Sequence, residues 1–390
     1  MTKIERTQLL VAGGGPVGLL AALCAQKQGL DVIVIERSFR GTPRGHTTLL
    51  HPSSIRILAE LGLSPLLLKA GRLIDEIDLR VERDRQRLKL PYPALAITQA
   101  IFEETLLKVL RRAEVDIRGT CEVTSLTQRD EQVEVAVARR ELTNASSRVA
   151  DEQWELTKSS SIQAEFVIGA DGCSSRVRRE LGIRCVTRPR ERYAMFEYPS
   201  ERLSLAELVI AESGSELIIP LPDGRARASF QLAQTASPTP DLALLTTLLA
   251  ERVQSQERPS DLHWSAIVDF EPALAEVSGR DRVWLAGDAA HSASPLGVQS
   301  MNHGLFEAWQ TTHLISAVAA GKEPVAALMR LARVQRQDWL RTLGIGADFE
   351  LLSHAPPWLA GHVQRVVAAL PVSGSDLEAV FQQLGIARAR

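Results

Sequence analysis

A glycine-rich turn near the start of the chain constrains its fold more than any other feature. The apolar run Leu9-Leu10-Val11 leads into Gly13-Gly14-Gly15-Pro16-Val17-Gly18, and an apolar helical pattern follows. In such a turn, Gly13 permits the tight bend, Gly15 lets the backbone approach a pyrophosphate, and Gly18 lets the helix pack on the strand. A second apolar strand, Val32-Ile33-Val34-Ile35, ends in Glu36, where an acidic side chain can bind the ribose of an adenosine. This order predicts a dinucleotide-binding unit, in which Glu36 disfavours NADP; a purely structural turn is the alternative.

The stretch from 282 to 304, RVWLAGDAAHSASPLGVQSMNHG, carries a second signal. An apolar strand stops at Gly287-Asp288, the turn passes through Pro295 and Gly297, and an amphipathic helix is expected to begin near Asn302. A carboxylate therefore lies at the carboxyl end of a strand, and unpaired backbone amides lie at the start of a helix. Such amides suit a phosphate, a carbonyl oxygen or an anionic ring.

A third segment has the same design. The strand Phe166-Val167-Ile168 runs into Gly169-Ala170-Asp171-Gly172-Cys173-Ser174-Ser175-Arg176-Val177-Arg178, which is an acid, a glycine turn and a helix start. Taken alone, this segment is equally well explained as an Asp-Gly turn before a solvated basic helix.

Together, the three motifs resemble the para-hydroxybenzoate hydroxylase family of single-component FAD-dependent monooxygenases, from about residue 8 to 343. The family pattern is G-x-G-x-x-G, then G-A-D-G-x-x-S-x-V-R, then G-D-A-A-H…P…G…N. This chain departs from it at Val298 and Ser300, which replace two glycines of the family's G-G-Q-G. The added side chains are expected to alter how closely the backbone approaches the flavin ring.

The resemblance and the chain pattern together predict an α/β fold. A Rossmann-like FAD-binding domain (1–71, 95–185 and 276–343) is interleaved with a mixed β-sheet substrate domain (72–94 and 186–275), and short helices follow in 344–390. The pattern predicts a β-excursion around Ile74 to Leu90, a helix from Thr98 to Arg112, and a hairpin around Pro222-Asp223-Gly224.

Composition narrows the class of protein. Lys plus Arg is 45 and Asp plus Glu is 47, so the net charge of −2 carries no nucleic-acid or membrane footprint. The four cysteines form no close pair, which indicates neither a disulfide framework nor a metal site. No uninterrupted apolar stretch is long enough to span a membrane. We expect a cytoplasmic monomer or homodimer without a metal.

Residue roles are implied by the resemblance. Glu36 should bind the adenosine ribose, Asp288 the ribityl chain, and Arg44 the pyrophosphate, with Arg37 and Arg40 competing. The amides near Met301 and Asn302 should face the N1 and O2 side of the flavin. The full set of expected FAD contacts is Gly13, Gly15, Pro16, Val17, Gly18, Glu36, Arg37, Arg44, Gln99, Asp171, Gly287, Asp288, Gly297, Met301 and Asn302. Solvated arginines at 37 and 44 and an exposed glutamine at 99 are the plain alternatives.

Two residues are candidates for the catalytic centre. Pro295 should lie beside the reactive edge of the ring. His291 belongs to the late motif; in this family that histidine mostly supports the loop, and direct acid/base chemistry is the less favoured reading.

The implied reaction uses NADH or NADPH as a transient reductant and O2 as co-substrate, and it hydroxylates an electron-rich small molecule. Counting back from the hairpin turn places the substrate-binding arginine of hydroxybenzoate-specific relatives near Leu221, in an apolar run. A largely apolar aromatic or polyketide-like substrate is therefore expected, because a buried carboxylate without a cation is costly. The expected substrate residues are Tyr193, Phe196, Leu217, Ile219 and Leu221. A flavin-dependent reductase of isoprenoid-type double bonds and a non-catalytic FAD-binding regulatory protein remain alternatives. The halogenase segment W-x-W-x-I-P does not occur.

Overall fold

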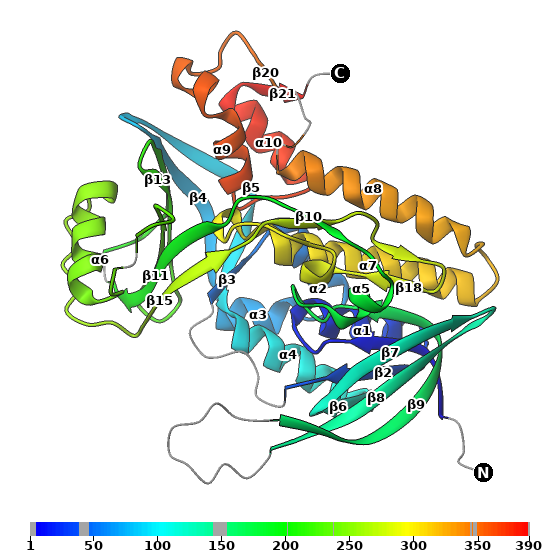
Figure 1. Cartoon of the computed structure of the whole chain (residues 1–390). Helices are drawn as coiled ribbons and strands as arrows, with labels where there is room; N and C mark the ends of the chain where they lie inside the picture. The colour runs from blue at the N-terminus through cyan, green and yellow to red at the C-terminus, as the bar shows by residue number, and fades with distance from the viewer. Residues whose placement is uncertain are drawn as a thin grey trace.

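Two large β-sheets organise the molecule (Figure 1). The computed structural model describes residues 5–38, 47–142, 154–200, 202–236, 238–343, 345 and 349–388. Within this part of the chain, no helix is both long and apolar enough to cross a bilayer.

The first sheet is mainly parallel and holds the glycine-rich turn. Its path is β17 (Gly279–Arg280), β18 (Val283–Leu285), β9 (Trp154–Gly169), β1 (Glu5–Ala12), β2 (Val32–Glu36) and β6 (Asp116–Gly119). The antiparallel strands β7 (Cys121–Arg129) and β8 (Gln132–Leu142) continue it from β9. Strand β1 is apolar throughout its second half because both of its faces are covered, and Leu9, Leu10 and Val11 are fully buried.

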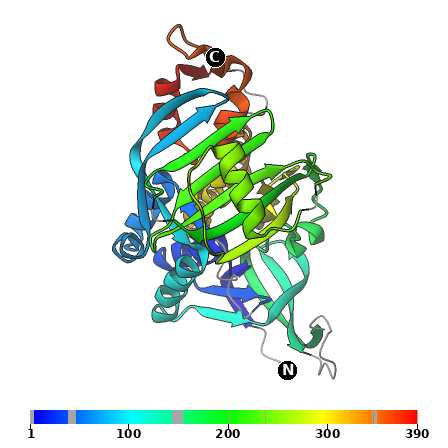
Figure 2. The same cartoon turned by 90° about the vertical axis from the view of Figure 1, so that its left-hand side faces the viewer.

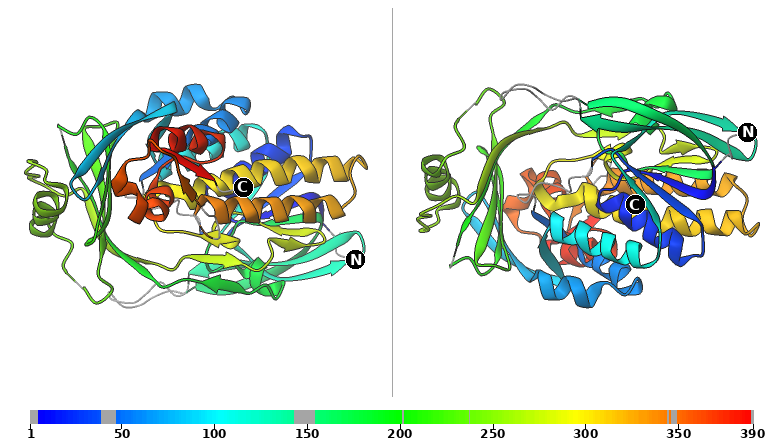
Figure 3. Two further views of the ribbon diagram at one scale, coloured as in Figure 1. Left: turned by 90° about the horizontal axis from the view of Figure 1, so that it is seen from above. Right: turned by 90° about the horizontal axis from the view of Figure 1, so that it is seen from below.

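Helices cover one face of this sheet. Helix α1 (Pro16–Lys27) packs against α4 (Gln99–Arg112) and α7 (Gln299–Ala319), and α8 (Ala326–Thr342) lies alongside α7 (Figure 3). Helices α2 (Pro52–Glu60) and α3 (Ser64–Ala70) follow β3, and the short helix α5 (Arg176–Glu180) follows β9. The predicted helix from Thr98 to Arg112 is confirmed, with Thr98 as its N-cap.

The second sheet joins segments far apart in sequence. Its order is β15 (Trp264–Phe270), β11 (Glu191–Pro199), β14 (Arg225–Leu232), β13 (Gly214–Pro220), β12 (Ala206–Ala211), β4 (Arg72–Val81), β5 (Asp84–Thr98) and β3 (Thr47–Leu50). The predicted excursion is the β4–β5 pair, which joins the later strands through parallel pairing of β4 with β12. The predicted hairpin is β13–β14. Helix α6 (Leu242–Leu248) and the π-helix η1 (Leu249–Val253) cover the outer face (Figure 2).

The C-terminal segment covers the inner face of the second sheet. It contains η4 (Pro357–Gly361), α9 (Val363–Ala369) and α10 (Ser375–Leu384), as predicted, and also an antiparallel pair, β20 (Phe349–Leu351) and β21 (Ile386–Arg388), which was not predicted. Val366, Leu370 and Phe381 share one apolar cluster with Leu79 and Leu217 of the sheet. The segment is therefore part of the core beneath the second sheet.

A third, small sheet connects the two halves. It contains β10 (Cys185–Thr187), β16 (Ala273–Ala275) and β19 (His291–Ser292). The 3₁₀ turns η2 (Gly287–Ala289) and η3 (Leu296–Val298) lie on either side of β19 in the chain. Helix α7 then begins at Gln299, three residues before the expected start, because the left-handed turn ends at Val298.

Candidate active site

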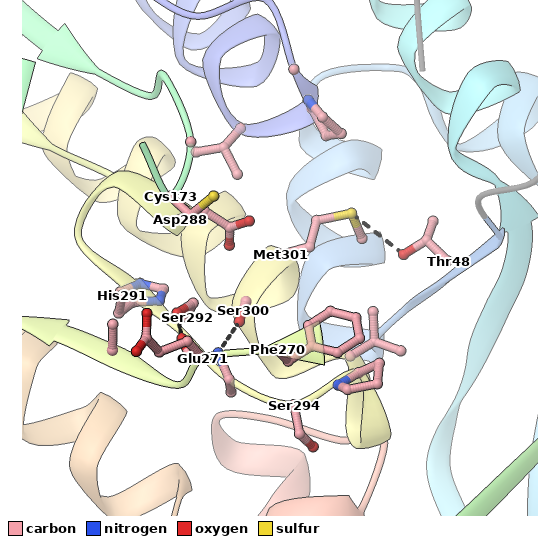
Figure 4. Close-up of a pocket in the computed structure, with 18 of the residues that line it drawn as sticks. Thr48, Cys173, Phe270, Glu271, Asp288, His291, Ser292, Ser294, Ser300 and Met301 are labelled. Carbon is pink, nitrogen blue, oxygen red and sulfur yellow. Dashed lines mark hydrogen bonds between the residues drawn. The ribbon is translucent and has the colours of Figure 1, made fainter. Parts of the chain in front are cut away.

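A cavity of about 780 Å³ lies where the two large sheets meet, and all three predicted motifs contribute to its wall (Figure 4). The N-terminus of α1, the turn after β9 and the loop between β18 and α7 line one part. Strands β11, β13 and β14 of the second sheet line another. The residues of the motifs that reach the cavity are Gly15, Pro16, Val17, Ala170, Gly172, Cys173, Ser174, Arg178, Ala286, Asp288, His291, Ser292, Ala293, Ser294, Pro295, Val298, Ser300 and Met301.

The start of α1 has the shape required to hold a diphosphate. A Cβ added to Gly15 would meet no heavy atom within 4 Å, whereas one added to Gly18 would lie 2.0 Å from the Gly13 carbonyl oxygen. Gly13 itself has φ +113, which favours glycine. No side chain caps the first turn of α1, so its amides remain available to an anion. Open space beside Gly15 and close packing at Gly13 and Gly18 match the roles expected of these glycines.

Glu36 closes the glycine turn from the end of β2. Its Oε2 accepts the Gly14 amide at 2.5 Å, and its Oε1 accepts the Ser38 amide at 2.6 Å. Each carboxylate oxygen has two lone pairs, so these bonds leave acceptor capacity for ribose hydroxyls. Arg37, next in sequence, is exposed and is not among the cavity residues, while Arg44 lies outside the described residues.

Asp171 binds the start of the helix that follows it. Its Oδ2 accepts the amides of Arg176 at 2.6 Å and Val177 at 3.1 Å, and its Oδ1 accepts the Ser175 hydroxyl at 2.5 Å. The carboxylate therefore fixes the start of α5, as in the turn-and-helix alternative. Its neighbours Ala170 and Gly172 line the cavity.

Asp288 projects from the η2 turn into the cavity (Figure 4). The cavity leaves the Asp288 side chain accessible, but many protein atoms lie close around its carboxylate. This loss of surrounding water raises the pKa of Asp288, and His291 opposes the rise. Gly287, with φ +60, is buried against Val17 and Gly304 and does not reach the cavity. The turn thus presents Asp288 while its glycine packs inward.

The turn before α7 has an unusual backbone. Gly297 has φ 73 and ψ −12, and Val298 has φ 51 and ψ 37, which is the left-handed region. A β-branched residue seldom adopts this conformation, and its strain is of order 1–3 kcal/mol. The family glycine replaced by Val298 would have no such strain. The second departure, Ser300, accepts the Ala293 amide at 2.7 Å and so ties the loop to the helix (Figure 4).

The Asn302 side chain faces the protein interior. Its Oδ1 accepts the His51 amide at 2.7 Å and the Ser54 hydroxyl at 2.8 Å, and its Nδ2 donates to the carbonyls of Leu49 and Val298, each at 2.8 Å. An Asn302 contact to the cofactor would therefore have to come from its backbone. Met301 lines the cavity, where its sulfur accepts the Thr48 hydroxyl at 3.4 Å.

His291 lines the cavity and belongs to a buried polar cluster that extends away from it. Its Nε2 lies 2.8 Å from Oε2 of Glu307, and its ring stacks on Trp339 with centroids 3.9 Å apart. His303 lies on the other side of Glu307, with its Nε2 3.3 Å from the Gln335 carbonyl. Because Glu307 and Gln335 engage Nε2 of the two histidines, the arrangement favours support of the loop over metal binding.

The register of the second sheet determines which side chains face the cavity. Leu217 on β13, Ser229 on β14 and Met195 on β11 form one row, and Ile219, Arg227 and Glu197 form the next. Leu217 and Ile219 line the cavity, as expected. The two rows place Ser229 and Arg227 next to Leu217 and Ile219 on one face of the sheet.

Three expected substrate residues lie elsewhere. Phe196 points to the opposite face, where it packs edge-on against Phe230 beneath α6, because successive residues of a strand alternate between faces. Leu221 follows β13 and is fully buried in the apolar core. Tyr193 is on the cavity-side face of the sheet, but it is buried, does not line the cavity and packs edge-to-face with Phe270, with ring centroids 5.9 Å apart. Phe196 and Leu221 are therefore corrected to core residues.

The second-sheet wall of the cavity contains a cation, Arg227, although none was expected there. The residue is 6% exposed, its Nη1 donates to Oε1 of Glu197 at 3.0 Å, and its guanidinium lies over the Trp264 ring at 5.1 Å. Burial lowers its pKa, although Glu197 opposes that effect. Sequence reasoning missed this residue because it placed the arginine before the hairpin turn. Arg227 and Ser229 are two residues apart on β14, and this spacing could have indicated a polar face on that strand.

Further lining residues were also missed. They are Thr48, Arg190, Asp269, Phe270, Glu271, Ser292 and Ser294, several of which appear in Figure 4. Thr48, Asp269 and Phe270 belong to strands of the second sheet, whose facing depends on register, and the others lie in or next to short loops. Gln99 does line the cavity, and its Nε2 donates to Glu103 at 2.8 Å.

Comparison with known proteins agrees with this geometry. Residues 6–335 match the family described as an FAD binding domain. The chain belongs to this FAD-binding family. Among curated proteins, it is 26% identical over 330 residues to the 6-methylpretetramide 4-monooxygenase of Streptomyces rimosus, covering 80% of this chain and 56% of that enzyme. It is 24% identical to the protoasukamycin 4-monooxygenase of Streptomyces nodosus subsp. asukaensis, covering 96% and 97% of the two chains.

The fold is also similar to solved structures. The p-nitrophenol 4-monooxygenase of Pseudomonas putida DLL-E4 superposes with a TM-score of 0.74 at 21% identity, covering 98% of this chain and 97% of that one. The chain spans a little more than half the length of the first of these curated relatives and nearly all of the protoasukamycin and p-nitrophenol enzymes. The open side of Gly15, the uncapped helix starts and the carboxylate of Asp288 suit a diphosphate, an anionic ring and a polyol chain, so the residues present fit FAD.

Proposed function

We propose that this protein is an FAD-dependent monooxygenase that uses NADH or NADPH and O2 to hydroxylate an electron-rich small molecule. One observation carries the proposal: a single cavity connects the FAD-binding turns of the first sheet to a mixed polar and apolar wall of the second. The named activities of the relatives support it. A cytoplasmic location and a monomeric or homodimeric state belong to the same proposal.

The proposed roles follow from the positions of the residues. The α1 amides beside Gly15 would hold the diphosphate, Glu36 the adenosine ribose, and Asp288 the ribityl hydroxyls. The first amides of α7, near Ser300 and Met301, would face the pyrimidine side of the ring and stabilise negative charge there. When bound, FAD supplies hydride acceptance from NADH or NADPH and activation of O2.

The protein's own contribution would be orientation and exclusion of water. Pro295 and Val298 would border the ring, and the sheet face with Met195, Leu217 and Ile219 would press a flat substrate towards it. His291 would act by holding the Asp288 turn through Glu307, since its Nε2 is engaged there. Direct proton transfer by His291 is not part of the proposal.

The substrate we propose is largely apolar but carries an acceptor oxygen. Arg227 and Ser229 lie among apolar side chains on the wall, and a hydrogen bond to a charged donor in such surroundings is stronger than a neutral one. Because Arg227 already pairs with Glu197, a ring hydroxyl or carbonyl suits it better than a full carboxylate. Phenolic and polyketide-like compounds have this chemistry.

The test uses purified protein reconstituted with FAD and a panel of neutral polycyclic phenols and small benzoates. We expect at least one phenol to stimulate NADH or NADPH oxidation and to gain one atom from ¹⁸O₂. The Gly15→Ala variant serves as a cofactor-free control. Anaerobic reduction of a double bond would identify a reductase. Bound FAD without any turnover across the panel would favour the regulatory alternative. Tight turnover of para-hydroxybenzoate would overturn the proposed substrate class.

A further inference from the structure

His51 lies at a junction of three distant segments. It is fully buried between β3 and α2. Its Nε2 lies 2.7 Å from the Gly297 carbonyl oxygen, its Nδ1 lies 2.9 Å from the Ser373 hydroxyl, and its own amide donates to Asn302 at 2.7 Å. The ring thus connects the turn before α7 to the C-terminal segment.

The partners fix the tautomer of the ring. A carbonyl oxygen can only accept, so Nε2 must carry the hydrogen that it donates to Gly297. In a neutral ring Nδ1 is then the acceptor, and the Ser373 hydroxyl donates to it. Ser53, whose hydroxyl lies 3.0 Å from that of Ser373, is left to donate in turn. Burial lowers the pKa of His51 to about 3, which agrees with a neutral ring.

The turn that His51 contacts needs support. Val298 has a left-handed backbone despite its β-branched side chain, and the backbone of the C-terminal segment closes tightly around Gly297. A Cβ added to Gly297 would lie 2.8 Å from the Ala368 carbonyl oxygen. The Gln299 side chain also donates to the C-terminal segment, at the Leu370 carbonyl, over 2.6 Å. A strained turn persists only where its surroundings determine it.

We infer that His51 is a positioning residue, which holds the Gly297–Val298 turn through its Nε2 hydrogen and couples this turn to the C-terminal segment through Ser373. It acts on the start of α7, where Val298, Ser300 and Met301 line the cavity, and it does not itself line the cavity. The part of this inference that concerns the cofactor rests on the proposed FAD site.

Two conservative variants separate the contacts of the ring. In His51→Gln the side-chain amide nitrogen lies near the position of Nε2 and can still donate to Gly297. In His51→Asn it lies near Nδ1 and cannot reach Gly297. We expect His51→Gln to bind FAD within about threefold of the wild type and His51→Asn to bind about tenfold more weakly, the change produced by loss of one net hydrogen bond.

The visible circular dichroism of bound FAD gives a second readout. It should change in His51→Asn and stay close to the wild type in His51→Gln, with Ser53→Ala as a control that leaves the ring contacts intact. Melting of the ligand-free variants reports whether each one folds. Equal effects of the glutamine and asparagine variants on FAD binding and dichroism would overturn the positioning role.

The tautomer is tested without any variant. In ¹⁵N-labelled, ligand-free protein, His51 should show a protonated Nε2 and an unprotonated Nδ1 from pH 5 to 8. A protonated Nδ1 in this range would overturn the inference. This measurement does not require FAD, so a failure of the proposed FAD site and a failure of the His51 role give different results.

Discussion

Oε2 of Glu307 accepts from both His291 Nε2, at 2.8 Å, and the Gly287 amide, at 3.2 Å. One buried carboxylate oxygen therefore fixes the turn that presents Asp288 and the histidine that follows it. Burial alone would raise the pKa of Glu307, but His291, His303 and the Gly287 amide outweigh burial and lower it.

Glu307→Gln should weaken this arrangement. The glutamine amide oxygen can take the place of Oε2 and accept from both His291 and the Gly287 amide, but as an uncharged acceptor it makes weaker hydrogen bonds. Its amide nitrogen then takes the place of Oε1, on the side of His303. We expect a loss of about 1–3 kcal/mol in the free energy of unfolding, together with weaker FAD binding. Urea unfolding and FAD titration measure the two effects. Glu323→Gln, at an exposed position after α7, is the matched control. An unaltered unfolding free energy in Glu307→Gln would contradict the assigned role.

Gly15→Ala should separate cofactor binding from folding. The added methyl group meets no protein atom within 4 Å and occupies the space proposed for the diphosphate. The ligand-free variant should melt like the wild type but retain no FAD after gel filtration. Gly18→Ala, whose Cβ would lie 2.0 Å from a carbonyl oxygen, should instead lower the melting temperature. Normal FAD retention by Gly15→Ala would place the diphosphate elsewhere.

Val298→Gly should stabilise the turn before α7. Glycine adopts a positive φ without strain, although it has more conformational freedom in the unfolded chain. The expected net gain in the free energy of unfolding is up to about 1 kcal/mol. Val298→Ala removes the same methyl groups but keeps the Cβ, so it should be the less stable of the two. Equal stabilities in thermal melting would show that the backbone strain is not released.

Glu197→Gln should destabilise the cavity wall. Glu197 is fully buried and pairs with both Arg225 and Arg227, so the substitution leaves a buried guanidinium without its counter-charge. The expected cost is about 3–5 kcal/mol, measured by urea unfolding. Asp223→Asn removes a half-exposed partner of Arg225 and should cost far less. Similar costs for the two variants would contradict the importance of the buried pair.

The buried His51 predicts a pH dependence of stability. Its pKa falls from 6.5 to about 3 on folding, so the unfolded state binds the proton more readily. The contribution of the neutral His51 ring to the free energy of unfolding is complete above about pH 6.5. It is lost as the pH falls towards 3, by up to about 1.4 kcal/mol per pH unit. His303 is also buried with a lowered pKa, so the informative quantity is the difference between the wild type and His51→Gln. That difference should shrink below pH 6; a constant difference would contradict this origin.

The cofactor side of the site was predictable from sequence because its geometry is local. Gly13, Gly15 and Gly18 act within one turn, and Asp288 follows its strand directly, so spacing alone indicates their positions. The same local reasoning did not distinguish a cofactor role for Asp171 from capping of α5, because both use an acid beside a glycine turn.

The opposite wall depends on strand register, which sequence does not specify without the partner strand. A shift of one residue exchanges Phe196 for Met195 and changes a predicted lining residue into a core residue. The arginine was missed for a related reason, since Arg227 lies after the hairpin turn and the prediction counted back from it. The role of the C-terminal segment beneath the second sheet required tertiary contacts that no short motif encodes.

The parallel pairing of β4 with β12 has a consequence for how the chain folds. Ile77 pairs with Ala206, which lies well over a hundred residues later in the chain. The edge of the β4–β5 hairpin therefore stays uncovered until β12 has been synthesised. Gly15 and Asp288 likewise meet only after most of the chain has been synthesised. High contact order of this kind slows folding and leaves strand edges open during translation. Chaperone dependence and aggregation during expression should therefore be sensitive to substitutions along β4 and β12, even though neither strand carries a residue of the proposed active site.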